Sequence, residues 1–247
     1  MGSKILKKIV GILGYKLLEK NFIKNTRLLS NSSTLNLNYI LEKLFNKELI
    51  HSVIQIGAND GDQFDNLSPF IKKYNTKAIL VEPIMEHFEE LKKNYSSYKN
   101  IIFENLAISE NTETKYLYSV KKIFHNSYGT YAKAISSFDI NHLIKHGIKK
   151  NHIEKISIKA ISINELINKH NFSNFDLLFI DAEGYDGEIV INFLKKKLEC
   201  KIIIFEYIHI NTEIMKKLTV LLLDHRYKFF NVDENLVCLK ENITIEI

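Results

Sequence analysis

Three acidic side chains stand at the ends of apolar runs of the kind that form buried strands. Asp181 and Glu183 follow the run 175–180, and Glu206 ends the run 202–206. Ligands of open parallel sheets bind outside the carboxyl ends of the strands, so we expect these carboxylates to meet at one site. Carboxylates there can take a proton from a hydroxyl or bind a hard cation such as Mg²⁺. We predict Asp181 as general base or metal ligand and as a cofactor contact, and Glu183 as a catalytic positioning group. A Mg²⁺ ion held by Asp181 and Glu206 is the alternative to a site without metal.

Histidine adds a further candidate for proton transfer. His209 lies just beyond Glu206 and can reach the same edge of the sheet, and His125 lies in a polar stretch that could close over an acceptor. The imidazole titrates near neutral pH, which suits a general base. A surface or packing role is the alternative for both. We count His209 with Asp181 and Glu183 as candidate catalytic residues.

Two glycines lie where the first apolar run, residues 52–56, turns towards a helix. Glycine at such a turn permits a positive φ and the close approach of a ligand, and the helix N-terminus that follows favours an anionic group. A purely structural turn is the alternative. The predicted cofactor contacts in this segment are Gln55, Gly57, Asn59, Asp60 and Gly61.

Glu82 and Pro83 end the next apolar run, about 20 residues after Gly61. An acidic side chain at this place accepts hydrogen bonds from the ribose diol of an adenosine cofactor. NAD and S-adenosylmethionine both carry that ribose. Asn59 separates them, because it occupies the position where a dinucleotide fingerprint needs glycine beside the pyrophosphate. The sequence therefore favours S-adenosylmethionine.

The third run, residues 101–107, ends with two further candidate contacts. Asn105 and Ala107 are expected to border the adenine ring. An asparagine that only closes the strand is the alternative.

The apolar runs alternate with segments of helical periodicity. Strands are expected over 52–57, 78–82, 101–107, 115–120, 175–181 and 202–206, and helices over 64–74, 86–95, 186–196 and 212–224. Short apolar strands that alternate with helices are typical of a doubly wound, mostly parallel sheet. A Ser162–Glu165 capping box marks the start of another helix.

The last two strands, 227–232 and 236–239, are separated by only three residues. So short a connection permits an antiparallel hairpin and excludes a parallel crossover. A seven-stranded, Rossmann-like sheet that ends in such a hairpin resembles class I methyltransferases.

Residues 121–159 interrupt the alternation with a polar loop, a helix over 138–146 and a short strand near 156–158. A long insertion in a compact domain usually carries function, so we predict a lid or an acceptor-binding element. Tyr128 and Tyr131 in this insertion could stack on a sugar ring.

Composition bounds the domain organisation. The chain has 247 residues, 45% hydrophobic and 26% charged, which fits one large globular domain and excludes disorder. We predict a helical extension over 1–48 and a cofactor-binding domain over 49–247. Cys200 and Cys238 lie in separate apolar runs and are expected to be buried free thiols, which favours the cytoplasm.

The net charge of +5 gathers in residues 1–48, and the remainder is near neutral. A near-neutral body argues against nucleic acid as the main partner. Residues 3–20 predict a basic amphipathic helix too short to cross a bilayer. Residues 3–27 could contact the inner face of a membrane or a partner, and packing of the helix on the domain is the alternative.

Several strings together resemble the FkbM-type methyltransferases over residues 51–207. The resemblance implies O-methylation of a hydroxyl, commonly on a sugar or a polyketide-like small molecule. In this chain Gln55 stands where such enzymes often have an acidic residue. The strings are Ile54-Gln-Ile-Gly-Ala-Asn-Asp-Gly61, Leu80-Val-Glu-Pro83, Ala107-Ile-Ser109, Ile135-Ser-Ser-Phe138, Ile161-Ser-Ile-Asn-Glu-Leu166 and, most specific, Ile180-Asp-Ala-Glu-Gly-Tyr185.

The sequence thus predicts methyl transfer from S-adenosylmethionine to a hydroxyl of a small molecule or glycan. Its richness in Lys, Ile and Asn favours a bacterial source, where a sugar of a surface polysaccharide is a fitting acceptor. Two alternatives stay open. One is a scaffold without activity that docks through its basic N-terminal helix, and the other is an NAD-dependent oxidoreductase.

Overall fold

The computed structural model describes residues 36–63 and 65–245, and one compact unit begins at Leu37. The predicted amphipathic helix over 3–20 and the proposed contact segment 3–27 lie outside the described residues. Among the described helices, none is long and apolar enough to span a bilayer.

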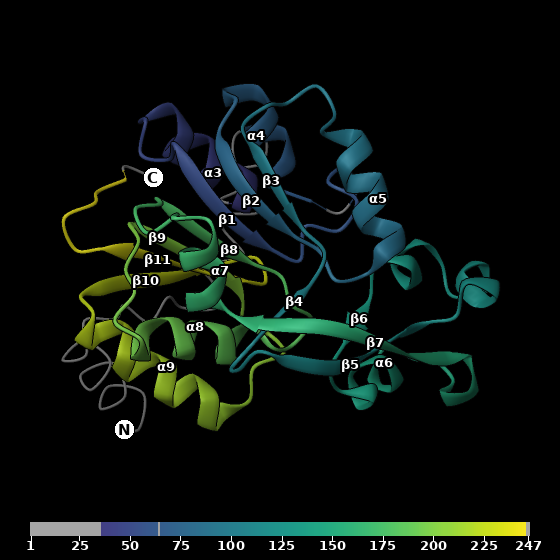
Figure 1. Cartoon of the computed structure of the whole chain (residues 1–247). Helices are drawn as coiled ribbons and strands as arrows, with labels where there is room; N and C mark the ends of the chain where they lie inside the picture. The colour runs from purple at the N-terminus through teal and green to yellow at the C-terminus, as the bar shows by residue number, and fades with distance from the viewer. Residues whose placement is uncertain (1–35, 64, 246–247) are drawn as a thin grey trace, which may run out of the picture. The chain divides into compact units, whose positions relative to one another are not determined.

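Seven strands form the central sheet, in the order β10-β11-β9-β8-β1-β2-β3 (Figure 1). β11 runs antiparallel to both β9 and β10, and the other neighbours pair in parallel. The predicted doubly wound sheet with a C-terminal antiparallel hairpin is therefore confirmed. The strands are β1 (Ser52–Ile56), β2 (Lys77–Val81), β3 (Ile101–Glu104), β8 (Leu177–Ile180), β9 (Ile202–Glu206), β10 (Tyr227–Val232) and β11 (Asn235–Lys240).

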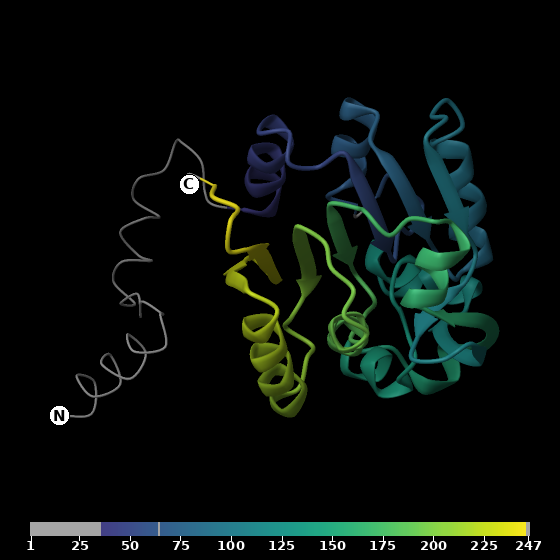
Figure 2. The ribbon, with the colours of Figure 1, turned by 60° about the vertical axis from the view of Figure 1, so that its left-hand side comes forward.

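Helices cover both faces of this sheet (Figure 2). Successive strand residues point to opposite faces, so Ile54 packs with one helical layer and Val53 with the other. The first layer contains α7 (Ile163–Lys169), α8 (Asp186–Lys195) and α9 (Thr212–Asp224). The second contains α3 (Leu37–Asn46), α4 (Ser68–Tyr74) and α5 (Met85–Asn94).

Helix α3 packs as part of the domain core. Its apolar side chains, among them Ile40, Leu41 and Leu44, are fully buried in the same cluster as the strands. These residues fall within the predicted extension over 1–48. In the structure the compact unit already includes them.

A second sheet of four strands stands beside the first, in the order β4-β7-β5-β6. The segment predicted as one strand over 101–107 is two strands, because the Asn105 amide donates to the carbonyl oxygens of Glu82 and Pro83 at 2.9 and 3.1 Å and turns the chain away. The predicted strand over 115–120 also belongs to this second sheet, where it pairs with β7. Its strands are β4 (Ala107–Ser109), β5 (Glu113–Val120), β6 (Ser136–Ser137) and β7 (Ile153–Ser162).

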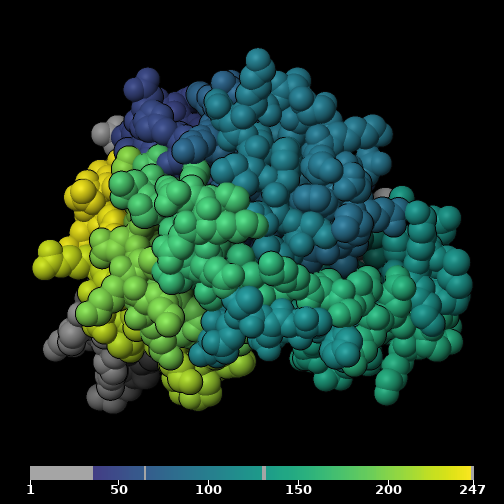
Figure 3. Space-filling model, in the orientation of Figure 1, coloured from purple at the N-terminus to yellow at the C-terminus, as the bar shows by residue number. Residues whose placement is uncertain are grey.

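The insertion carries the helix α6 (Ile140–Lys145) and the 3-10 helices η1 (Lys122–Ser127), η2 (Thr130–Lys133) and η3 (Lys150–His152). Helix α6 begins two residues later than predicted, because Asp139 accepts the Asn141 N–H at 2.9 Å and caps it. The strand predicted near 156–158 is ten residues long, since all of β5 pairs with it. In Figure 3 the teal surface of the insertion adjoins the blue surface around α5, where Lys122 Nζ lies 2.6 Å from Glu86 Oε1.

Two other helix starts show where local side chains compete with the backbone. Helix α4 begins at Ser68 rather than at residue 64, because Asp65 Oδ1 accepts the N–H groups of Leu67 and Ser68. At α7 only half of the predicted capping box forms. Ser162 Oγ accepts the Glu165 N–H at 3.2 Å, whereas the Glu165 carboxylate accepts the hydroxyl of Thr112.

Both cysteines are free and buried, as predicted. Tyr227 donates its hydroxyl to the Cys200 carbonyl oxygen at 2.7 Å, which ties the start of β10 to the chain before β9.

The end of β1 holds its two neighbouring strand ends together. The N–H groups of Gly57 and Ala58 both donate to Val81 O at 3.0 Å, and the Asp181 N–H donates to Ile56 O at 2.9 Å. Gly57 has φ 81°, and a Cβ placed on it would overlap the carbonyl oxygen of Asp181. Only glycine therefore lets the β1 turn pass the end of β8.

Comparing two alanine substitutions separates this steric constraint from the positive φ. Gly147 also has a positive φ, 82°, but nothing lies within 4 Å of its added Cβ. Gly147→Ala should lower the free energy of unfolding by about 1–2 kcal/mol, the cost of a left-handed conformation. Gly57→Ala should cost about 1–3 kcal/mol more, because the Cβ must displace backbone. Urea unfolding measures both, and equal losses would show that the contact at Asp181 is not tight.

Candidate functional site

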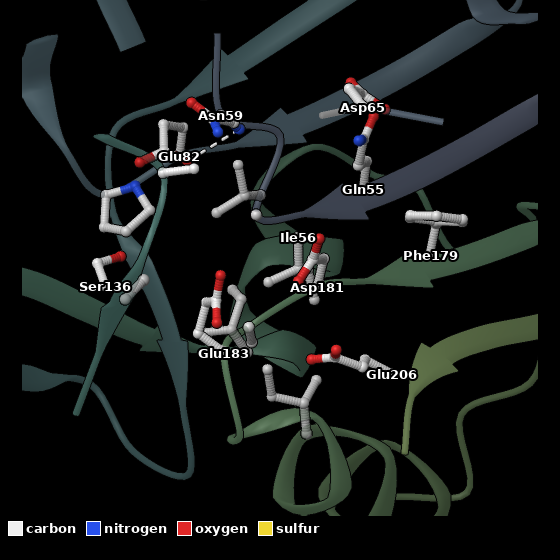
Figure 4. A pocket seen from close by; sticks show the side chains of 18 of the residues that line it. Gln55, Ile56, Asn59, Asp65, Glu82, Ser136, Phe179, Asp181, Glu183 and Glu206 are labelled. Carbon is white, nitrogen blue, oxygen red and sulfur yellow. Dashed lines mark hydrogen bonds between the residues drawn. The ribbon is translucent and has the colours of Figure 1, made fainter. Parts of the chain in front are cut away.

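A cavity of about 290 Å³ opens at the carboxyl ends of β1, β2, β8 and β9 (Figure 4). The second sheet and the insertion close one side through Leu117, Ala134, Ser136 and Phe138. Most of the residues predicted as cofactor contacts, catalytic groups or metal ligands line this cavity. They are Gln55, Gly57, Asn59, Glu82, Pro83, Ala107, Asp181, Glu183 and Glu206.

Four of the predicted residues lie outside this lining. Asp60 accepts the N–H groups of Asp62 and Gln63 and so shapes the turn. Gly61 lies against Leu91 and Tyr95 under helix α5. The remaining two are Asn105, whose amide bonds the Glu82–Pro83 backbone, and His209, which lies among other histidines.

Glu82 is 5% exposed and is held by two backbone N–H groups. Its Oε2 accepts the Asn59 N–H at 3.0 Å, and its Oε1 accepts the Ile84 N–H at 2.8 Å. Burial raises the pKa of Glu82 to about 7 against the lowering effect of these donors. Each carboxylate oxygen has a second lone pair, so Glu82 can still accept hydrogen bonds from a ligand.

Gln55 and Asp65 face one another at another side of the cavity (Figure 4). Among the described residues, Gln55 Oε1 and Asp65 Oδ2 are buried with no hydrogen-bond partner. An unpaired buried acceptor costs free energy, so two beside one cavity mark a place for a ligand that donates. Sequence reasoning missed Asp65, because it lies in a loop where no strand or helix pattern points to it.

The carboxylates at the ends of β8 and β9 form a crowded acidic group (Figure 4). The Asp181 side chain is exposed through the cavity, but the protein packed around it and the nearby charges of Glu183 and Asp186 raise its pKa well above the usual range. Burial raises the pKa of Asp186, which is 0% exposed, to about 7. Burial and the neighbouring carboxylates raise the pKa of Glu206 to about 8. The site therefore favours a positively charged ligand.

Glu183 is fixed by residues of the insertion. It has a left-handed φ of 48°, its carbonyl oxygen accepts the Ser137 hydroxyl at 2.8 Å, and its Oε2 lies 3.1 Å from His142 Nε2. Gly184, with φ 94°, continues the turn and leaves room for the His142 ring. Glu183 thus joins the end of β8 to the insertion.

Three histidines cluster next to Glu183. The ring centroids of His142, His146 and His209 lie 4.6 to 5.1 Å apart. Sequence reasoning found His209 and missed the other two, although their spacing of four residues on a predicted helix was a usable signal. Burial lowers the pKa of His146 and of His209; His142 adds to the effect on both, and His146 adds to the effect on His209. His125 lies apart, with Nε2 2.9 Å from Val120 O.

Comparison with known proteins places these features in a family. A family model described as the methyltransferase FkbM domain matches residues 55–229. No curated protein matches the sequence.

Solved structures show more distant similarity. A methyltransferase FkbM from Methylobacillus flagellatus KT is 11% identical with a TM-score of 0.46, and the match covers 77% of this chain but only 44% of that protein. An O-methyltransferase from Bacillus cereus, solved with SAH, is 11% identical over 96% of this chain and 97% of that one, with a TM-score of 0.44. A fibrillarin pre-rRNA processing protein from Methanococcus jannaschii is 14% identical over 78% and 67%, with a TM-score of 0.39.

The family model spans well over half of the sequence and includes the end of β1 with the turn that follows it, the Glu82 strand end and the Asp181–Tyr185 string. The chain belongs to the FkbM methyltransferase family.

Proposed function

We propose that this chain transfers a methyl group from S-adenosylmethionine to a hydroxyl oxygen of a small molecule or glycan. A sugar of a bacterial surface polysaccharide, or a related metabolite, is the favoured acceptor. The observation that carries the proposal is a single cavity lined by three kinds of group. These are the buried Glu82 carboxyl, the unpaired acceptor atoms of Gln55 and Asp65, and the carboxylates at the ends of β8 and β9.

The cavity residues fit S-adenosylmethionine. Glu82 offers lone pairs to a ribose diol, and Gln55 Oε1 with Asp65 Oδ2 offers two acceptors to an α-ammonium group. Burial raises the pKa of Asp65, and in its ionised form Asp65 would supply the negative charge that Gln55 lacks. When bound, the cofactor supplies a methyl group activated by a sulfonium.

The same charges disfavour a dinucleotide. Glu82, Asp181 and Glu206 all line the cavity, and a pyrophosphate there would face three acidic side chains. Asn59 also keeps its side chain in the lining where a pyrophosphate needs glycine. These observations support S-adenosylmethionine over NAD. A scaffold without activity is tested by cofactor binding below.

Asp181 is our choice for the group that removes the hydroxyl proton. Its raised pKa makes it a stronger base once ionised, and it lies between the cofactor contacts and Glu206. Methyl transfer from a sulfonium removes charge as it proceeds, so alignment and exclusion of water do more than electrostatic stabilisation. Glu183 and the insertion residues that line the cavity would align the acceptor. Mg²⁺ held by Asp181 and Glu206 is the alternative.

Cofactor binding tests the Glu82 assignment. Glu82→Ala should weaken binding of S-adenosylhomocysteine by about 100-fold, because charge-assisted hydrogen bonds to the ribose contribute roughly 1.5–3 kcal/mol each. Isothermal titration calorimetry measures the affinity. Glu90→Ala is the matched control, since Glu90 is exposed on α5, where it pairs with Lys93. Unchanged affinity in Glu82→Ala, with Glu90→Ala as reference, would reject the ribose contact.

The raised pKa of Glu82 gives this binding a pH dependence. Below pH 7 the carboxyl is protonated and accepts weaker hydrogen bonds, so affinity should fall as pH falls through about 7. The wild type should bind S-adenosylhomocysteine roughly tenfold more weakly at pH 6 than at pH 8. Glu82→Gln should flatten this dependence. A slope that persists in Glu82→Gln would assign the titration to another group.

Labelled methyl transfer tests the chemistry. With [methyl-³H]S-adenosylmethionine and a panel of sugars and other hydroxyl compounds, we expect label in stable methyl ethers. Asp181→Asn should lower kcat by about 10²–10⁴-fold, the usual contribution of a general base. Asp224→Asn, at the exposed end of α9, is the control.

Two results would change the assignment of the acceptor or of the mechanism. Label in amines or nucleic acid would contradict O-methylation of a small molecule or glycan. Activity that EDTA removes and Mg²⁺ restores would make Asp181 and Glu206 metal ligands instead.

A further inference from the structure

Three imidazoles from two separate elements converge beside the acidic strand edge. His142 and His146 stand at the start and the C-cap of α6 in the insertion, and His209 follows β9 in the main sheet. One ligand nitrogen from each ring can be chosen so that all three lie within 4.8 Å of one another. The fold, and not sequence proximity, brings His209 to the other two.

We propose that His142, His146 and His209 bind one divalent transition-metal ion of the Zn²⁺ class. Imidazole nitrogen suits Zn²⁺, whereas Mg²⁺ prefers oxygen ligands. The ligand set is distinct from the Asp181 and Glu206 carboxylates. The inference does not depend on the identity of the methyl acceptor.

The spacing of the rings is close to what the metal needs. Three nitrogens at about 2.0–2.1 Å from one Zn²⁺ lie roughly 3.4 Å apart in a tetrahedral site. The nitrogens of this cluster, which lie within 4.8 Å of one another, therefore have to close by at most about 1.4 Å, which side-chain rotation can supply. The spacing of four residues between His142 and His146 places both rings on one side of α6.

Carboxylates support the cluster as they do in known metal sites. Histidines that bind metals usually direct their other ring nitrogen to a carboxylate, which fixes the ring and its tautomer. His142 Nε2 lies 3.1 Å from Glu183 Oε2, and His209 Nε2 lies 3.8 Å from Glu206 Oε1. Both carboxylates also offset the charge of a divalent ion that three neutral ligands leave uncompensated. His142 is only 8% exposed, so its orientation is set by this packing.

A bound metal ion is expected to hold helix α6 of the insertion against the ends of β8 and β9, where Glu183 and Glu206 lie; we call this arrangement the clamp. A metal bound by α6 and by the segment after β9 would fix α6 against Glu183, which lines the cavity. Metal binding would then order the side of the cavity that receives the acceptor. That consequence rests on the proposed function, whereas binding of the ion itself does not.

Titration of Zn²⁺ into metal-free, tag-free full-length protein tests the site. We expect one ion per chain, and visible d–d absorption bands when Co²⁺ replaces Zn²⁺. His146→Ala and His209→Ala, which change different elements, should each weaken Zn²⁺ binding at least 100-fold. Glu183→Gln should weaken it by about 10–100-fold through the His142 ring. His51→Ala, at an exposed histidine outside the cluster, should bind Zn²⁺ like the wild type.

Zn²⁺ binding by the wild type and the two histidine variants decides whether the metal site exists. Absence of Zn²⁺ binding in the wild type, or wild-type affinity in either folded histidine variant, would overturn the proposal. Circular dichroism identifies a variant that fails to fold, and the other variant then decides.

Zn²⁺ should slow amide hydrogen exchange in residues 140–146 by at least tenfold in the wild type but not in His209→Ala. Unchanged exchange in the wild type would reject the clamp. Loss of methyl transfer with intact Zn²⁺ binding would count against the proposed function alone.

Discussion

The carboxyl end of strand β1 is the point on which the site depends. Its backbone binds β2 through Val81 and β8 through Asp181, so the side chains that follow these two strands must face one cavity. Gly57 makes this geometry possible, since any Cβ at that position would overlap the Asp181 carbonyl. Glu82 and Asp181 are separated widely in sequence and are brought together by this one turn. The cofactor contacts and the proposed base are thus set by the same backbone hydrogen bonds.

The site concentrates negative charge at a cost to the free protein. Burial raises the pKa of Glu82 and Asp186 to about 7 and that of Glu206 to about 8, above their values in an unfolded chain. Groups shifted in this direction favour the folded state while they are protonated, and that contribution is lost as pH rises from about 4 through 7 to 8. A cationic ligand offsets the repulsion near neutral pH. The electrostatics that oppose folding therefore favour the sulfonium cofactor and, at the histidine cluster, a divalent cation.

Local patterns predicted the main sheet because its strands are continuous apolar runs with clear ends. The helix Thr212–Asp224 and the strand Ile202–Glu206 begin and end where the sequence indicates, and the short hairpin connection settles the direction of β11. The second sheet was not predictable in the same way. Its strands β5 and β7 pair across the whole insertion, and the side-chain hydrogen bonds of Asn105 lie at the point where β4 separates from β3.

The residues of the candidate site, like the two sheets, differ in how far the sequence could predict them. Glu82 and Asp181 follow strand ends, where spacing carries information, whereas Asp65 lies in a loop and becomes relevant only through its tertiary contacts. A crystal structure with S-adenosylhomocysteine tests the central claim most directly. The account predicts the ribose hydroxyls within hydrogen-bond distance of the Glu82 carboxylate, and the amino group between Gln55 and Asp65. A ligand bound elsewhere on the domain, or one in this cavity with its ribose away from Glu82, would contradict it.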